Sequence, residues 1–164
     1  MIEFKTREAR QEDLEQIIQL YHDTVIAVNS KDYNEEQISV WSDVSGGGHN
    51  FSKKITEQNF YVAEFENKII GFGSVTDDGY LDYMYVHKDF QRKGVAKKLL
   101  QELEKISDEL QVARITSHVS ITARGFFEKN GYEKESDHID KHKGVEFINF
   151  VMVKRKEKFY RDRK

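Results

Sequence analysis

The stretch from Tyr80 to Leu100 reads YLDYMYVHKDFQRKGVAKKLL and changes character twice. Its first part, up to Val86, is rich in β-branched and aromatic residues, which is typical of a strand. From Val95 onward the apolar residues recur at a spacing of about 3.6, which indicates an amphipathic helix. The charged segment between the two is short. The stretch therefore predicts a strand, a tight basic loop and a helix.

The basic loop reads QRKGVA over residues 91–96 and leads directly into the predicted helix. The first turn of a helix has unpaired N–H groups and the positive end of the helix dipole, which together favour an anion. Gly94 and Ala96 allow the backbone to approach that anion, and Gln91, Arg92 and Lys93 supply donors and charge. A solvated helix start would explain a lone basic residue, but the order of strand, loop and helix favours a phosphate-bearing ligand.

This segment resembles the central motif of the GCN5-related N-acetyltransferase (GNAT) family. That motif is Arg or Gln, two residues, Gly, any residue, then Gly or Ala, after a strand that ends in hydrophobic-x-Val; Met84-Tyr85-Val86 and Gln91 to Ala96 match it. The resemblance implies acetyl-CoA as donor, with its pyrophosphate on the loop amides and its pantetheine arm on the strand end. The coenzyme-binding residues it implies are Met84, Tyr85, Val86, Gln91, Arg92, Lys93, Gly94, Val95, Ala96, Lys97, Ser120 and Phe127.

Length and composition are those of one ordinary domain, which we expect to span residues 1–164. The formal net charge of −3 does not mark the chain as a nucleic-acid binder. No apolar run has the length of a membrane span, and the N-terminus lacks the apolar core of a signal peptide, so a cytoplasmic location is predicted. The absence of cysteine excludes disulfides and thiolate zinc sites.

The remaining sequence predicts alternating strands and helices. The predicted strands cover residues 2–10, 60–65, 69–76, 80–86 and 113–119, with a final hairpin over 132–140 and 145–153. The predicted helices cover residues 14–29, 35–42, 95–109 and part of 120–132. The segment 43–51, with glycines at 46–48, is predicted to be a loop. The resemblance implies an α/β fold of the GNAT type: a mixed twisted sheet of six or seven strands and about four helices.

The segment from Ser120 to Tyr132 resembles the element of the family that borders the coenzyme. Ser120 stands where the family often has Asn, and Phe127 stands where a Tyr would protonate the leaving thiolate. The bacterial YafP-like subgroup of the family, which the chain resembles most closely, also has a double Phe there. An acetyltransferase is therefore the main prediction. The alternative is a non-catalytic coenzyme A-binding sensor or partner module that has lost the acid.

Acetyl transfer to an amine requires a base for the ammonium and a donor for the thioester oxygen. The resemblance implies Asp82 or Tyr80 as the base and the N–H of Tyr85 or Val86 as the donor, and Glu64 is a further candidate base acting through water. Asp82 is either a partly buried base or a strand carboxylate paired with a lysine. Strand alternation predicts Tyr80 and Asp82 on one face, and residues 83 and 85 on the other.

Other polar residues have weaker claims to a function. The loops between the first helices are predicted to line the pocket of a small amine acceptor, with Tyr33, Trp41 and His49 as candidate lining residues. His118 is either structural or catalytic. Residues 138, 140 and 142 are His, Asp and His on one predicted strand face, but exposed polar groups explain them better than a metal, and no metal is predicted. The basic tail 154–164 is predicted to be a solvated end. The protein is expected to be a monomer or a homodimer.

Overall fold

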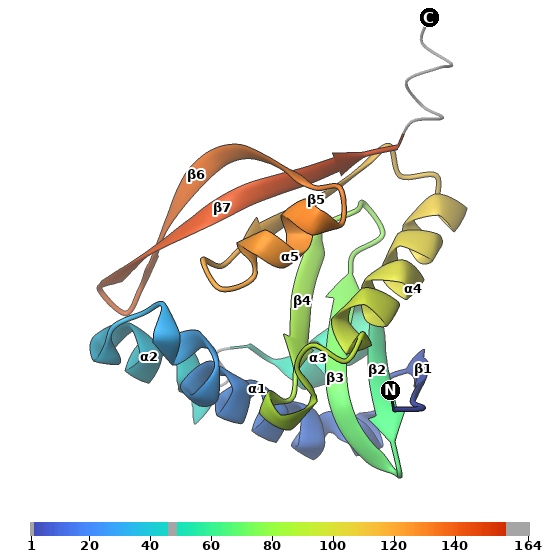
Figure 1. Cartoon of the computed structure of the whole chain (residues 1–164), viewed down its shortest axis with the longest axis horizontal. Helices are drawn as coiled ribbons and strands as arrows, with labels where there is room; N and C mark the ends of the chain where they lie inside the picture. Colours follow the sequence, from blue (N-terminus) through green and yellow to red (C-terminus); the bar gives the residue numbers. More distant parts are fainter. Residues whose placement is uncertain (1, 46–48, 157–164) are drawn as a thin grey trace, which may run out of the picture.

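A computed structural model of the chain describes residues 2–45 and 49–156, and over these it contains seven strands and five α-helices (Figure 1). The strands are β1 Lys5–Glu8, β2 Asn59–Phe65, β3 Lys68–Val75, β4 Leu81–Val86, β5 Arg114–Val119, β6 Glu133–His142 and β7 Val145–Arg155. The helices are α1 Leu14–Ala27, α2 Glu35–Ser42, α3 Phe51–Glu57, α4 Val95–Glu109 and α5 Arg124–Lys129. The predicted α/β fold is confirmed. The glycine loop 46–48 and residues 157–164 of the predicted tail lie outside the described residues.

The strands form two antiparallel sheets, in the orders β1-β2-β3-β4 and β5-β7-β6. A parallel bridge between Tyr80 and Thr116 connects the two sheets at the start of β4. Close to it, the Thr116 N–H donates to the Gly79 carbonyl at 3.0 Å, and the Ser117 hydroxyl donates to the Leu81 carbonyl at 2.8 Å. The predicted single sheet is thus divided in two, because β4 and β5 meet at one end and then part.

Helices cover the two faces of the first sheet. On one face, α1 buries Ile17, Tyr21 and Val25 in a core that it shares with β2, β3 and β4. On the other face, α4 packs directly on the backbone of β3, since a Cβ added to Gly71 would lie 2.9 Å from Val95 Cγ1. Gly73 has the same relation to α4, further along the helix. The two glycines therefore set how closely α4, and with it the basic loop, approaches the sheet.

Two local features differ from the expectation. Strand β1 has only its four residues from Lys5 paired with β2, so the predicted strand over 2–10 is too long. Helix α3 was not expected at all, since its seven residues are mostly polar and carry no long apolar stripe. It begins after Asn50, whose φ of 46° lies in the left-handed region and whose side chain accepts from the Lys53 N–H. Asparagine tolerates both roles, which explains why the helix starts there.

Candidate functional site

The two sheets form a fork where β4 and β5 separate beyond the Tyr80–Thr116 bridge. Met84, Tyr85 and Val86 pair with β3 along one edge of β4. The other edge faces β5, and no strand among the described residues pairs with it there. Unpaired strand edges present N–H and C=O groups that an extended polar ligand can bind. Alternation along β4 turns the backbone groups of Met84 and Val86 to this open edge, whereas those of Tyr85 pair with Phe72 on β3. Two of the three strand residues predicted to contact the coenzyme therefore present backbone groups there.

The basic loop brings the start of α4 to the end of β4. Gly94 is the residue before the helix, with φ of +84°, and no side chain in the described part of the chain caps the first turn. The Gln91 amide donates to the carbonyl of Val86 and so ties the loop to the strand. Gln91 therefore has a structural role in addition to the contact with an anion that the motif predicts. The N–H groups of the first helical turn remain open to an anion.

The side chains of the loop point in different directions. Val95 is buried against the sheet, so its contribution at this site is its backbone N–H. Arg92, Lys93 and Lys97 are exposed, and Ala96 is half-buried. A Cβ added to Gly94 would meet nothing within 4 Å, so the space beside the helix start is open. The loop thus combines open amides with exposed positive charge, as an anion site requires.

Ser120 and Phe127 shape the element that follows β5. The Ser120 hydroxyl accepts from the Ala123 N–H at 3.1 Å and so stabilises the turn into α5. Phe127 is buried, with its ring edge-on to Tyr132 at 5.1 Å between centroids. The Tyr132 hydroxyl is also buried and has no hydrogen-bond partner among the described residues. Burial raises the pKa of Tyr132, which makes it a weak proton donor.

Asp82 occupies a bulge in β4. Val75 is opposite Leu81 and Ser74 is opposite Tyr83, so Asp82 is the extra residue on its strand. The bulge places Asp82 and Tyr83 on the same face, and the predicted alternation, with residue 82 opposed to residue 83, is wrong. The ammonium of Lys54, on α3, lies 3.1 Å from Asp82 Oδ2 and 2.8 Å from the Tyr83 hydroxyl. Asp82 is therefore a half-buried carboxylate paired with a lysine, one of the two alternatives expected for it.

A directed chain of hydrogen bonds continues from Tyr83 into the core. The Tyr21 hydroxyl donates its one hydrogen to the Trp41 carbonyl at 2.9 Å, so at 2.7 Å from it His49 Nε2 must be the donor. His49 Nδ1 is then an acceptor, and the Tyr83 hydroxyl donates to it at 2.9 Å. Burial lowers the pKa of His49 to about 4, which agrees with a neutral ring. The hydroxyl oxygen of Tyr83 is then free to accept a hydrogen bond from the Lys54 ammonium.

The residues expected to line the acceptor pocket gather against β4. Trp41 Nε1 donates to the Tyr85 hydroxyl at 3.3 Å, and the ring of Tyr33 lies edge-on to Trp41 at 4.9 Å. His49 contacts Tyr83, as described above. The three predicted lining residues thus gather near the side chains of Tyr83 and Tyr85 on β4. No sequence motif marks this arrangement.

Tyr80 and His118 lie together at the closed end of the fork. Their rings are edge-on with centroids 5.4 Å apart, and the ring of His138 lies 4.4 Å from that of His118. Burial raises the pKa of Tyr80, and the charge of Asp82 raises it further. Burial also lowers the pKa of His118. The structure thus brings Tyr80, Asp82 and His118 to the same end of β4.

Glu64 is placed elsewhere in the sheet. It is paired with Ile69 on β3, at the end of β3 opposite to the residues that flank Asp82. Its carboxylate accepts from Arg7 Nε at 2.8 Å, and this hydrogen bond lowers the pKa of Glu64. Arg7 also binds both oxygens of the buried Asp13. The structure therefore does not bring Glu64 to Asp82.

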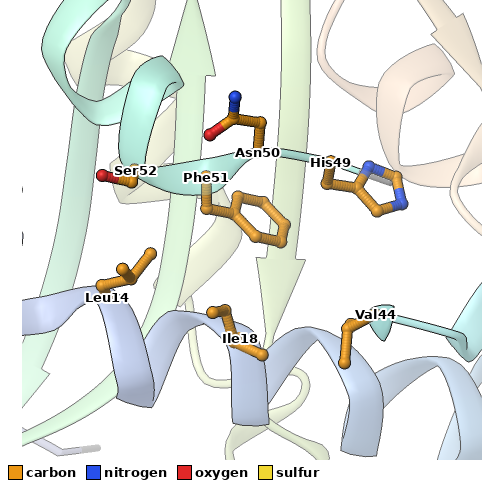
Figure 2. A pocket seen from close by; sticks show the side chains of 7 residues that line it. All are labelled: Leu14, Ile18, Val44, His49, Asn50, Phe51 and Ser52. Atoms are coloured by element: carbon orange, nitrogen blue, oxygen red, sulfur yellow. The ribbon is translucent and has the colours of Figure 1, made fainter. Parts of the chain in front are cut away.

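A cavity of about 160 Å³ lies between α1 and the start of α3, outside the fork (Figure 2). Figure 2 shows the ring of Phe51 pointing toward α1, where Leu14 and Ile18 form the opposite wall. Val44, Asn50 and Ser52 complete the lining with His49, which also bonds to Tyr83. The lining carries no cluster of charged groups. The polar chemistry therefore lies at β4 and not in this cavity.

Two kinds of site are not found in the described part of the chain. No group of three or more His, Cys, Asp or Glu side chains within residues 2–45 and 49–156 has an arrangement suited to a metal ion, and this includes the alternating residues of β6. None of the helices in these two ranges is both long enough and apolar enough to cross a bilayer.

Comparisons with known proteins point to one family. The model of the acetyltransferase (GNAT) domain matches residues 29–154. The uncharacterized N-acetyltransferase YafP of Escherichia coli (strain K12) is 30% identical over 140 residues, which cover 85% of this chain and 88% of YafP. A GCN5-related N-acetyltransferase structure from Rhodopseudomonas palustris has a TM-score of 0.88 at 24% identity, over 93% of this chain and 95% of that one. The PaiA N-acetyltransferase of Thermoplasma acidophilum, solved with coenzyme A, has a TM-score of 0.76 at 23% identity, over 94% and 100% of the two chains.

Proposed function

Because this chain belongs to the acetyltransferase (GNAT) family, we propose that it is an N-acetyltransferase that moves an acetyl group from acetyl-CoA directly to the primary amine of a small molecule. The observation that carries the proposal is the uncapped start of α4 beside the open edge of β4. The helix start suits a pyrophosphate, and the open strand edge suits an extended amide-containing arm. The coenzyme A in the PaiA structure supports the same class of donor.

In this proposal the donor is held by the residues predicted from the motif. The first-turn amides of α4 bind the pyrophosphate, and the exposed Arg92, Lys93 and Lys97 add positive charge around it. Met84 and Val86 bind the arm through backbone groups on the open edge of β4, whereas the backbone groups of Tyr85 are paired with β3. Acetyl-CoA, when bound, supplies the acetyl group as a thioester. Of the two N–H groups predicted to donate to the thioester oxygen, that of Val86 faces the open edge and takes this role.

The proposed acceptor side lies on the face of β4 that carries Asp82. Asp82 takes the proton of the acceptor ammonium, and its charge contributes to raising the pKa of the nearby Tyr80. Glu64 is a weaker candidate, because Arg7 already occupies its carboxylate. Tyr33, Trp41 and His49 form the walls of the acceptor pocket in this proposal. Their aromatic rings suit a small organic amine.

Several parts of the proposal extend beyond the family assignment. We propose a single acetyltransferase domain over residues 1–164, located in the cytoplasm, without a metal, nucleic-acid or membrane partner, and acting as a monomer or a homodimer. The non-catalytic alternative has one observation in its favour, since Phe127 is buried and has no hydroxyl to protonate a thiolate. An acetyltransferase and a non-catalytic module would both bind the coenzyme, but only the acetyltransferase would turn it over.

The first experiment is the thermal midpoint with and without acetyl-CoA. At about a hundred times a micromolar dissociation constant, binding adds about 2.7 kcal/mol to the free energy of unfolding. For a chain of this size we expect the midpoint to rise by several degrees. An unchanged midpoint would remove the coenzyme site and every residue role that depends on it.

The second experiment measures thiol release from acetyl-CoA across a panel of small primary amines. We expect steady release with at least one amine, and a fall of about a hundredfold or more in kcat/KM for Asp82→Asn if this carboxylate is the base. Binding of acetyl-CoA without release, whichever amine is present, would favour the sensor or partner module. Release that persists in Asp82→Asn would transfer the role of base to another group.

A further inference from the structure

Helix α3 holds the carboxylate of Asp82 by one of its two oxygens. Lys54 Nζ and Gln58 Nε2 both donate to Asp82 Oδ2, at 3.1 and 2.9 Å. Lys54 and Gln58 are four residues apart, so they lie one above the other on the same side of the helix, where the Gln58 N–H also bonds to the Lys54 carbonyl. Among the described residues no hydrogen bond reaches Asp82 Oδ1. The carboxylate thus has one bound oxygen and one open oxygen.

The two donors are themselves held in place. The Ser74 hydroxyl, fully buried on β3, donates to Gln58 Oε1 at 2.7 Å, so the amide of Gln58 must turn its NH₂ toward Asp82. The Lys54 ammonium also donates to the Tyr83 hydroxyl and lies 4.7 Å from the centre of the Tyr83 ring. The His49 chain fixes the direction of the Tyr83 hydroxyl. We call Lys54 and Gln58 the clamp. Their side chains are held in place by Ser74, Tyr83 and His49 before an acceptor binds.

We propose that Lys54 and Gln58 are positioning residues for acetyl transfer, which hold Asp82 by its Oδ2 and present its Oδ1 to the ammonium of the acceptor. This inference rests on the proposed function of Asp82. Two donors on one oxygen of a carboxylate leave the other oxygen free in a fixed direction. In this role Lys54 contacts Asp82 and not the reacting atoms.

Other titratable groups face Asp82 from the elements around it. Tyr80 precedes it on β4, and the charge of Asp82 reaches His118 on β5. His49 lies before α3, and its ring is also within reach of the Asp82 charge. His138 and Asp140, on β6, act on His118 and Tyr80 in turn. Lys54 is the lysine bonded to Asp82, and its substitution leaves these other groups in place.

The test compares Lys54→Met with Lys53→Met. Lys53 is the preceding residue of α3, and its side chain is 62% exposed and paired with Glu57 instead of Asp82. The readout is the position of the Asp82 carboxylate in crystal structures of the variants, and it requires no acceptor. Without the Lys54 ammonium, we expect this carboxylate to turn away from its present orientation in Lys54→Met, and to keep it in Lys53→Met and Lys54→Arg. An unchanged Asp82 carboxylate in Lys54→Met would overturn the proposal.

A kinetic arm connects the clamp to catalysis. With an amine that turns over, we expect kcat to fall about tenfold or more in Lys54→Met and to be restored in Lys54→Arg. Acetyl-CoA binding, followed by the thermal midpoint, should match that of Lys53→Met. A moved carboxylate with an unchanged kcat would reject the catalytic part of the clamp. Wild-type protein that binds or transfers nothing would reject the proposed function, while the crystal structures would still report on the clamp.

Discussion

Asp82 and Tyr83 are neighbours in the sequence, and their side chains nevertheless lie on the same face of the sheet, where they share the ammonium of Lys54. The bulge in β4 makes this possible, because it inserts one residue into the strand between Leu81 and Tyr83. A carboxylate and a phenol thus lie side by side on one face of β4. In a regular strand the two groups would point to opposite faces.

The coenzyme loop can be tested with a matched pair of glycines. Gly94 and Gly144 both have φ near +80°, and an added Cβ would meet nothing within 4 Å at either position. Gly94→Asp and Gly144→Asp should therefore carry similar strain, but only the first places a carboxylate at the start of α4. We expect Gly94→Asp to raise the dissociation constant of acetyl-CoA at least tenfold, as measured by calorimetry. Equal affinities in the two variants would contradict a phosphate site at α4.

The buried hydroxyl of Tyr132 offers a test of stability. It has no hydrogen-bond partner among the described residues, so Tyr132→Phe removes a group that is buried without compensation. We expect the free energy of unfolding in urea to stay the same or to rise by about 1 kcal/mol. Tyr33→Phe is the control, because the Tyr33 hydroxyl accepts from the Ile121 N–H at 2.9 Å, and its loss should cost about 1 kcal/mol. A larger loss in Tyr132→Phe than in the control would show that the hydroxyl has a partner in solution.

Arg7 holds two carboxylates near the start of α1. Arg7→Met leaves Asp13, whose side chain is 6% exposed, and Glu64 without their cation, and we expect a loss of about 3 kcal/mol at pH 7. Arg7 lowers the pKa of both carboxyls, so this contribution is present above their unfolded pKa of about 4 and lost as the pH falls. Unfolding curves of wild type and variant should therefore converge below about pH 3. The exposed Arg10 provides the control: Arg10→Met should change stability little at either pH.

His49 should make the stability depend on pH in the acid range, below about pH 6.5. Its pKa is about 4 in the folded protein and about 6.5 in an unfolded chain, so the unfolded state binds more protons between these values. The wild-type protein should lose stability as the pH falls from 6.5 toward 4, with a slope near 1 kcal/mol per pH unit in excess of His49→Asn. Between pH 7 and 8 the two curves should run parallel. Parallel curves over the whole range would mean that His49 is not buried in its neutral form.

The sequence was most informative where local chemistry determines the structure. The pattern from Tyr80 to Leu100 predicted β4, the loop and α4, and the structure has α4 over Val95–Glu109 as expected. These elements depend on periodicity, on a glycine at positive φ and on the helix start, all of which are local. The family motif then gave the relation of loop to strand.

The acceptor side was much less predictable. Lys54 lies on a short polar helix without periodicity and Gln58 directly follows it. Their role depends on the bulge at Asp82, which the sequence does not mark. The hydrogen bond from Tyr83 to His49 joins residues 34 positions apart. Such contacts arise from tertiary packing, so no local pattern could reveal them. The same holds for the pair of Arg7 with Glu64, a carboxylate that the strand register places at the other end of β3 from Asp82.

The fork between β4 and β5 has a consequence for the architecture as a whole. Over the described residues the two sheets are joined by the bridge between Tyr80 and Thr116, and beyond it β4 and β5 each have one edge that pairs with no strand. In the proposed function, a pantetheine arm lying on β4 would act as an added strand and bond to the outward-facing backbone groups of this edge. The donor would then extend the first sheet as well as react, and each release of coenzyme would shorten that sheet again.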